Sequence, residues 1–189
     1  MEKLMINPDK DQGSAVSADT YLEIRNITPE DSRSAISNVY EQSWKHAYQG
    51  IVPQDYLDSI PKGQWALHIE EAGRRNLVMV RDGMIIGTSG FGKSRMQNMQ
   101  DYGEVISLYL LPEYMGKGYG RQLLQAVISE LENMGFDKVF LWVLEENRKA
   151  RRFYERFGFI QNEHFLINSI GNRELKEVQY YISLKAGWK

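Results

Sequence analysis

LYLLPEYMGKGYGR, residues 108–121, contains the clearest structural signal in the sequence. Its apolar start is typical of a buried strand, which ends at Pro112, and three alternating glycines then lead into an amphipathic helix. Glycine allows backbone N–H groups to converge without side chains in the way, and the N-terminus of a helix adds partial positive charge. The turn therefore predicts a cradle for an anion such as a diphosphate. The residues of this cradle are Gly116, Lys117, Gly118, Tyr119, Gly120 and Arg121.

The same turn has two other interpretations. A glycine-rich turn can serve only to pack a strand tightly against the next helix, with no ligand. The spacing also differs from the dinucleotide-binding pattern G-x-G-x-x-G because position 121 is Arg. The turn therefore gives little support to a nicotinamide or flavin site.

Regular patterns continue on the C-terminal side of the turn. Apolar residues recur at helical spacing over 120–134, and Gly135 follows where a C-terminal cap belongs. A nearly continuous apolar run at 138–144 predicts a strand covered on both faces. A second helix is predicted over 147–157, with Asn147 as its N-cap and Gly158 at its end.

The rest of the chain alternates between strand and helix patterns. Before the turn we predict strands at 21–25, 76–81, 84–91 and 104–111, with helices from 28 to about 44 and over 53–60. After it we predict strands at 165–167 and 178–184. Asp82-Gly83 is a strong hairpin signal. This order predicts an α/β (α+β) fold in which helices pack against a mixed sheet.

Composition limits the function classes. The 189 residues suit one domain at 20–189 after a loose, polar tail at 1–19. Net charge −2 argues against a nucleic-acid binder, and the lack of an apolar run of membrane-spanning length or of a signal peptide predicts a cytoplasmic protein away from membranes. The chain has no Cys and 3 scattered His, so we expect neither a metal site nor a cysteine nucleophile.

A second group of polar residues lies on the helix predicted over 147–157. Asn147, Ala150 and Tyr154 occupy positions i, i+3 and i+7, so they share one face. A phenol has an ordinary pKa near 10, stays protonated at neutral pH and can donate a proton to a departing thiolate. The alternative is that Tyr154 belongs to an apolar core stripe with Phe153 and Phe157.

These two segments together resemble one known family. Residues 108–124 resemble the diphosphate-binding motif of the GNAT superfamily of acyl-CoA-dependent N-acetyltransferases, often written Q/R-x-x-G-x-G/A. Residues 147–159 match its N-x-x-A-x-x-F-Y-x-x-x-G-F motif at every defined position. One departure is Met115, where the family usually has Gln or Arg. The resemblance is specific over 104–159.

The resemblance implies a fold and a cosubstrate. It implies a GNAT-like mixed central sheet of about seven strands, flanked by helices and splayed between the fourth and fifth strands. Acetyl-CoA would be bound as cosubstrate, with its diphosphate at the amides of residues 116–121. Asn147 would hydrogen-bond the pantetheine, and Tyr154 would approach the sulfur. Backbone groups of Leu108, Tyr109 and Leu110 would bind the pantetheine arm beside a bulge.

Glu104 is the candidate general base. The acceptor amine is mostly ammonium at neutral pH and must lose a proton before it attacks. Some GNAT enzymes have a glutamate at the matching position, and strand alternation places Glu104 initially on the face of Leu108 and Leu110. The bland alternative is a solvated charge at a strand end. With no Cys, direct transfer in a ternary complex is expected, and the N–H of Leu110 would stabilise the oxyanion.

The acceptor is expected to be a small-molecule or peptide amine, and family analogy admits a homodimer. Aromatic residues that could stack on a cationic amine are Trp44, Tyr48, Tyr56 and Phe165, although aromatics at such positions are usually core.

Two other functions remain open. Residues 87–94, GTSGFGKS, fit the P-loop pattern G-x-x-x-x-G-K-[ST], which makes an NTPase the main rival, although no substantial helix pattern follows. A non-catalytic acyl-CoA sensor on the same fold is the other.

Overall fold

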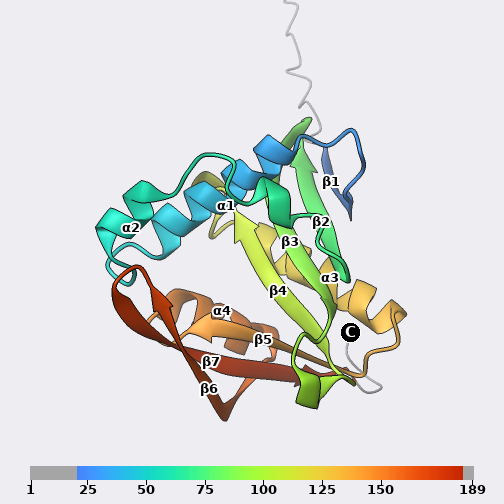
Figure 1. The fold of residues 1–189 in the computed structure, drawn as a ribbon. Coiled ribbons are helices and arrows are strands. Elements are labelled where there is room, and N and C mark those ends of the chain that lie inside the picture. Colours follow the sequence, from blue (N-terminus) through green and yellow to red (C-terminus); the bar gives the residue numbers. More distant parts are fainter. Residues whose placement is uncertain (1–20, 185–189) are drawn as a thin grey trace, which may run out of the picture.

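The structure, a computed structural model, describes residues 21–184 and is drawn in Figure 1. The predicted tail at 1–19 lies outside the described residues. The described part of the chain forms four α-helices, α1 (Arg33–Ala47), α2 (Gln54–Ser59), α3 (Tyr119–Asn133) and α4 (Arg148–Phe157). Its strands are β1 (Leu22–Asn26), β2 (Arg74–Arg81), β3 (Met84–Lys93), β4 (Gly103–Leu110), β5 (Lys138–Leu144), β6 (Ile160–Ile170) and β7 (Arg173–Ser183).

The seven strands form one mixed sheet in the order β1-β2-β3-β4-β5-β7-β6. Every neighbouring pair is antiparallel except β4 and β5, which are parallel. That parallel pairing covers only Gly103↔Val139, Glu104↔Phe140 and Val105↔Leu141. Beyond it the two strands diverge, and Figure 1 shows β4 and β5 as the two arms of a V. The predicted fold class and the splay between the fourth and fifth strands are confirmed.

Local sequence signals explain the elements on either side of this opening. Asn147 caps α4, because its Oδ1 accepts a hydrogen bond of 3.1 Å from the N–H of Ala150. Gly158 ends the same helix in the left-handed conformation, φ 118°. Between β2 and β3, Asp82 and Gly83 both have positive φ, as a tight hairpin turn requires.

The predicted start of α1 is wrong by several residues. Ser32 is the N-cap, and its Oγ accepts from the N–H of Ala35 at 3.2 Å. The residues before it form a turn, in which Asp31 accepts hydrogen bonds from the N–H of Thr28 at 2.8 Å and from Arg25 at 2.7 and 2.8 Å. Asp31 is therefore used to join β1 to the turn and does not lie in the first helical turn.

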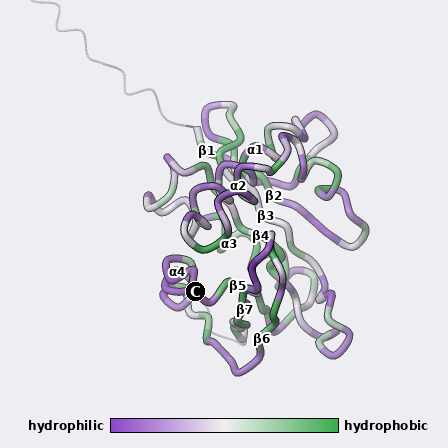
Figure 2. The backbone as a smooth tube through the Cα atoms, turned by 60° about the vertical axis from the view of Figure 1, so that its left-hand side comes forward, coloured by the Kyte–Doolittle hydropathy of each residue, from purple (hydrophilic) through white to green (hydrophobic). Residues whose placement is uncertain are grey.

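Two faces of the sheet are covered by different helices. The largest apolar cluster lies on the α3 side, where Leu123, Leu124, Val127 and Leu131 are all 0 % exposed. The opposite face carries α1, with Ile36 and other buried residues against β2. Figure 2 shows α4 mostly purple, because most of its residues are charged. The core therefore keeps both halves of the sheet in place around the opening.

Candidate active site

A bulge in β4 lies at the point where the sheet opens. Gly90 pairs with Ser107 and Phe91 pairs with Val105, so Ile106 has no partner on β3. From the same residue onward, β4 has no strand partner on the side of β5 in the described part of the chain. The backbone of residues 106–110 therefore runs along the opening. Leu111 donates its N–H to Ile86 of β3, so alternation turns the backbone groups of Tyr109 towards β3 and those of Leu108 and Leu110 towards the opening. The carbonyl oxygen of Leu110 accepts a hydrogen bond from the hydroxyl of Ser43.

The bulge also reverses the alternation of side chains along β4. Leu108 and Leu110 pair with Ser89 and Gly87 and lie on the α3 face, in or against the main apolar cluster. Glu104 pairs with Gly92 and falls on the other face. The expectation that Glu104 shares a face with Leu108 and Leu110 is wrong, because the extra residue shifts the period-two pattern by one.

The glycine turn leaves a row of backbone donors open. After the short 3₁₀ helix η3 (Pro112–Tyr114), Gly116 and Gly118 adopt positive φ of 73° and 87°, and α3 begins at Tyr119. The backbone N–H groups of residues 116–121 donate to no acceptor among residues 21–184. A Cβ built on Gly116 or Gly118 meets nothing within 4 Å, so open space lies in front of the turn.

Cationic side chains surround this turn. Lys117 lies 5.9 Å from the ring centre of Tyr114, and Arg121 lies 5.2 Å from that of Phe157. Arg81, from β2, donates a 2.9 Å hydrogen bond to the phenol oxygen of Tyr119. Sequence reasoning missed Arg81, because nothing local shows that the end of β2 reaches a turn about forty residues later. The turn thus combines open N–H groups with positive charge, the arrangement that binds phosphate oxygens.

Asn147 and Tyr154 lie on the α4 side of the opening. Asn147 is 8 % exposed; its Oδ1 is used by the cap, while its Nδ2 donates to no acceptor among the described residues and is not sealed from solvent. The ring of Tyr154 packs between Phe153 and Phe159 at centroid distances of 5.1 and 5.8 Å. Tyr154 therefore has the apolar contacts of a core residue, as the alternative interpretation proposed.

The hydroxyl of Tyr154 nevertheless remains unpaired. It has no hydrogen-bond partner among residues 21–184. Burial raises its pKa well above the ordinary value, and the neighbouring phenol of Tyr109 raises it further. Tyr154 is therefore a protonated donor at neutral pH, with a hydrogen that no group in the described part of the chain accepts.

An aromatic cluster lies on the other side of β4, beneath α1. The hydroxyl of Tyr109 accepts a hydrogen bond from the indole N–H of Trp44 at 3.1 Å and is 3.4 Å from the hydroxyl of Tyr48. Burial raises the pKa of Tyr109 to about 12, and it raises that of Tyr48 well above its ordinary value. The two phenols and the indole are joined through their polar groups into one aromatic cluster on the α1 side of β4.

The predicted acceptor aromatics do not all meet there. Trp44, Tyr48 and Tyr56 pack on one cluster with Leu144 and Leu175. Phe165 instead pairs with Val178, lies under Lys176 at 4.9 Å and is 56 % exposed. The register of β6 therefore places Phe165 on the opposite face of the sheet from the other three aromatic residues. The sequence alone does not show this register, so the prediction that Phe165 joins them is wrong.

Glu104 is buried and held by one arginine. It is 2 % exposed, and Arg95 donates to it through the backbone N–H at 3.0 Å and through guanidinium hydrogen bonds of 2.7 and 3.2 Å. The Arg95 side chain itself is 63 % exposed. Both carboxylate oxygens of Glu104 are therefore occupied by a partner that is able to move into solvent.

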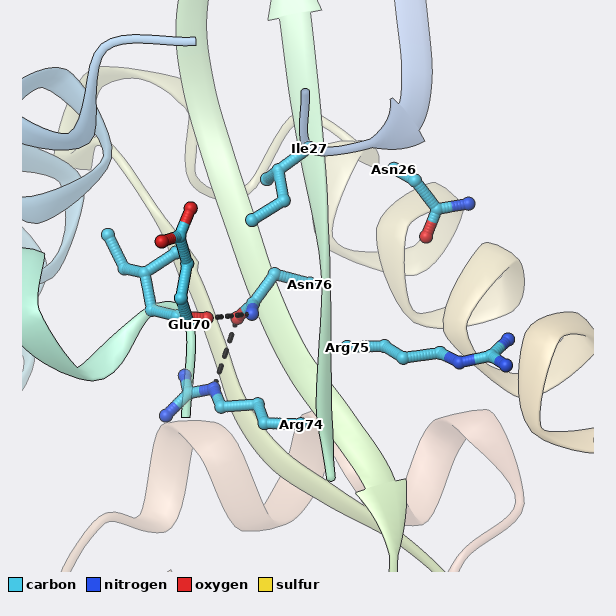
Figure 3. A pocket seen from close by; sticks show the side chains of 7 residues that line it. Asn26, Ile27, Glu70, Arg74, Arg75 and Asn76 are labelled. Carbon is cyan, nitrogen blue, oxygen red and sulfur yellow. Dashed lines mark hydrogen bonds between the residues drawn. The ribbon is translucent and has the colours of Figure 1, made fainter. Parts of the chain in front are cut away.

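The pocket drawn in Figure 3 is a separate hollow at the other end of β2. Two of its polar side chains are already used: Asn76 donates to the backbone oxygen of Ile69, and Arg74 donates to Asn76 at 3.1 Å. Arg74 also contacts the hydroxyls of Tyr40 and Ser107. The pocket lining consists of Asn26, Ile27, Ile69, Glu70, Arg74, Arg75 and Asn76.

The P-loop interpretation of residues 87–94 is wrong. Residues up to Lys93 lie within β3, where they pair with β2 on one side and β4 on the other. A P-loop needs a strand to end before the glycines and a helix to follow them. Only a short 3₁₀ helix, η2 (Gln97–Met99), comes next.

The described residues contain neither a cluster of metal ligands nor a membrane-spanning helix. Between residues 21 and 184, no group of three or more His, Asp or Glu side chains is placed to hold a metal ion. No helix in that range is long and apolar enough to cross a membrane.

Comparison with known proteins identifies the family. The model of the acetyltransferase (GNAT) family matches residues 35–159, which include the glycine turn, Asn147 and Tyr154. The chain belongs to the GNAT family. It is 31% identical to the uncharacterized N-acetyltransferase YuaI of Bacillus subtilis, over 82% of this chain and 89% of that protein. The predicted resemblance to the GNAT superfamily is confirmed, and this GNAT chain is an N-acetyltransferase by family.

Two more relatives of the GNAT chain come from Thermoplasma acidophilum. The spermidine N(1)-acetyltransferase is 28% identical over 73% of this chain and 88% of that protein. The crystal structure of PaiA N-acetyltransferase in complex with coenzyme A is 25% identical, with a TM-score of 0.65, and covers 83% of this chain and 98% of that chain.

Proposed function

We propose that this GNAT chain transfers an acetyl group from acetyl-CoA directly to an amine acceptor in a ternary complex. The observation that carries the proposal is the row of backbone N–H groups at residues 116–121, which have no acceptor among residues 21–184 and lie at a turn where Gly116 and Gly118 border open space. A diphosphate supplies oxygens of the right charge and spacing for such a row. Support also comes from the relative that was crystallised with coenzyme A.

The residues around the opening fit the rest of that cosubstrate. Backbone groups of residues 106–110, which have no strand partner towards β5, suit the amides of a pantetheine arm. The open Nδ2 of Asn147 is a further donor on the α4 side. Met115 contributes no polar group at the position where the family usually has Gln or Arg, so the backbone and the cations of the turn carry the binding of the diphosphate.

Three groups are proposed to take part in the transfer. Acetyl-CoA supplies the acetyl group as a thioester. The N–H of Leu110 donates a hydrogen bond to the carbonyl oxygen, and Tyr154 donates its proton to the sulfur as the carbon–sulfur bond breaks and the carbon–nitrogen bond forms. Glu104 accepts the proton of the amine through water. Because both its oxygens are hydrogen-bonded to Arg95, this step requires the exposed arginine side chain to release one of them.

A thiol-release assay across a panel of amines tests the proposal. We expect acetyl-CoA to bind and coenzyme A thiol to appear only when a suitable amine is present. Binding without thiol release from any small amine or peptide N-terminus would favour an acyl-CoA sensor instead. Absence of acetyl-CoA binding would overturn the proposal.

A further inference from the structure

Glu177 occupies an unusual place for a carboxylate. It lies on β7, an interior strand of the sheet, between Leu144 of β5 and Leu166 of β6. Partners across strands share a face, and Leu144 belongs to the apolar cluster against which Trp44 and Tyr48 of the α1 side pack. Glu177 is therefore half-buried on the face that the aromatic cluster covers.

Glu177 has one hydrogen-bond partner and no counterion in the described part of the chain. Its Oε2 accepts a 2.8 Å hydrogen bond from the amide of Asn168. No basic group between residues 21 and 184 lies within ion-pair distance of it, and Oε1 accepts no hydrogen bond there. Since every fully buried polar side-chain atom in that range has a partner, Oε1 must reach solvent.

Other carboxylates near this face are already compensated. Glu104 is held by Arg95, whose charge also reaches Glu177 without forming an ion pair. Glu41 accepts from the hydroxyl of Ser37 at 3.0 Å and from the N–H of Gly63 at 2.6 Å. Glu177 is thus a carboxylate with an open oxygen and an unbalanced charge in a partly desolvated position.

The surroundings of Glu177 connect it to the acceptor side of the opening. It lies across from Leu144, which belongs to the apolar cluster on which Tyr48 packs, and the hydroxyl of Tyr48 is 3.4 Å from that of Tyr109. The phenol of Tyr109 also raises the pKa of Tyr154. Burial raises the pKa of Glu177 itself, as expected for a carboxylate that lacks a partner cation.

We propose that Oε1 of Glu177 and the rings of Tyr48 and Tyr109 form a subsite for an ammonium group of the acceptor. Aromatic faces and an uncompensated carboxylate both favour a cation, and an aliphatic ammonium fills both requirements at once. This assignment rests on the proposed acetyl transfer for its place in a reaction, but the subsite is a binding property of its own.

The chemistry selects which nitrogen binds there. The nitrogen that attacks the thioester must be neutral, whereas a nearby carboxylate stabilises the charged form of an amine. Glu177 therefore suits a nitrogen that stays charged while another one reacts. The acceptor class that follows is an aliphatic amine with a second ammonium group, a diamine or polyamine.

Binding of two matched probes tests the subsite without turnover. Calorimetry in the presence of saturating coenzyme A measures the affinity of cadaverine and of 1,5-pentanediol, in which hydroxyl groups replace both ammonium groups. We expect the wild-type protein to bind cadaverine about 10- to 100-fold more tightly, the range for a charge-assisted hydrogen bond in a partly desolvated site. Glu177→Gln keeps the shape and removes the charge, so this preference should fall below about threefold.

Glu174→Gln is the control, because Glu174 lies on the same strand, is exposed and has no ion pair among the described residues. It should keep the preference. Thermal unfolding and acetyl-CoA affinity check that Glu177→Gln remains folded. Equal affinity of the wild type for the two probes, or a preference that survives in Glu177→Gln, would overturn the subsite.

Turnover then separates the subsite from the reaction. With acetyl-CoA, Glu177→Gln should raise KM for cadaverine and leave KM for acetyl-CoA unchanged. If the wild type binds cadaverine selectively and acetylates no amine, the proposed function fails while the subsite stands. If it acetylates cadaverine and Glu177→Gln leaves the KM for cadaverine unchanged, the subsite fails while the function stands.

Discussion

Replacement of Tyr154 by Phe isolates one hydroxyl group at the opening. The ring of Tyr154 is held by Phe153 and Phe159, whereas its hydroxyl has no partner among residues 21–184. Tyr154→Phe therefore keeps the contacts of the ring with both phenylalanines. Because no hydrogen bond is lost, we expect the free energy of unfolding to change by no more than about 0.5 kcal/mol.

The expected effect on turnover is much larger. A positioned general acid contributes about 10²- to 10⁴-fold to a rate. An alkyl thiol has an ordinary pKa near 8.5, so its thiolate already leaves well without help. The lower end of the range therefore applies, and kcat should fall about 100-fold, which corresponds to about 3 kcal/mol in the barrier. The affinity for acetyl-CoA should change little.

Single-turnover thiol release with a saturating amine measures the chemical step directly. Tyr180→Phe is the matched control: Tyr180 is 0 % exposed, donates to Glu155 at 2.6 Å and accepts from Arg151 at 3.1 Å. It should cost about 1–3 kcal/mol of stability and leave the rate per folded molecule intact. A Tyr154→Phe enzyme with wild-type turnover would refute a role of this phenol as the acid.

Three further substitutions probe other parts of the account. Gly118→Ala places a side chain on a left-handed residue at φ 87°, which costs about 1–2 kcal/mol. The Kd for acetyl-CoA, measured by calorimetry, should therefore rise about tenfold. An unchanged Kd would speak against the turn as the binding element. Glu104→Gln should lower kcat at least about tenfold at neutral pH with acetyl-CoA affinity kept, and normal turnover would remove Glu104 as the base. Hydrogen bonds from Arg25 lower the pKa of Asp31 from 3.8 to about 2, so Asp31→Asn should lose about 2 kcal/mol of unfolding free energy at pH 7. Since a lowered carboxyl pKa stabilises only above the unfolded value, denaturation curves of Asp31→Asn and wild type should converge between about pH 4 and pH 2, and a constant difference would contradict the assignment.

The helices and strands around the opening could be predicted because their signals are local. The strand at Lys138–Leu144 is a continuous apolar run, and α4 is bounded by Asn147 and Gly158, which act as its caps in the structure. β6 was predicted much too short. Most of its side chains are exposed, so its alternation is not one of apolar and polar residues, and its length is set by pairing with β7.

The glycine turn and the α4 residues Asn147 and Tyr154 could be predicted from local motifs, whereas the contacts between distant strands could not. Gly116 and Gly118 predict the turn directly. Arg95, the partner of Glu104, comes from a loop whose position depends on where β3 ends. The bulge at residue 106 leaves no mark in the composition of β4, yet it decides which face each side chain takes. Glu177 lay outside the predicted strand at 178–184, and its place depends on the pairing of β7 with β5 and β6.

A crystal structure of the protein with coenzyme A would show directly whether the glycine turn binds the diphosphate. We expect diphosphate oxygens within about 3 Å of the backbone nitrogens of residues 116–121, with the pantetheine arm beside residues 106–110 in the opening between β4 and β5. Coenzyme A bound elsewhere, with those nitrogens contacting only water, would contradict it.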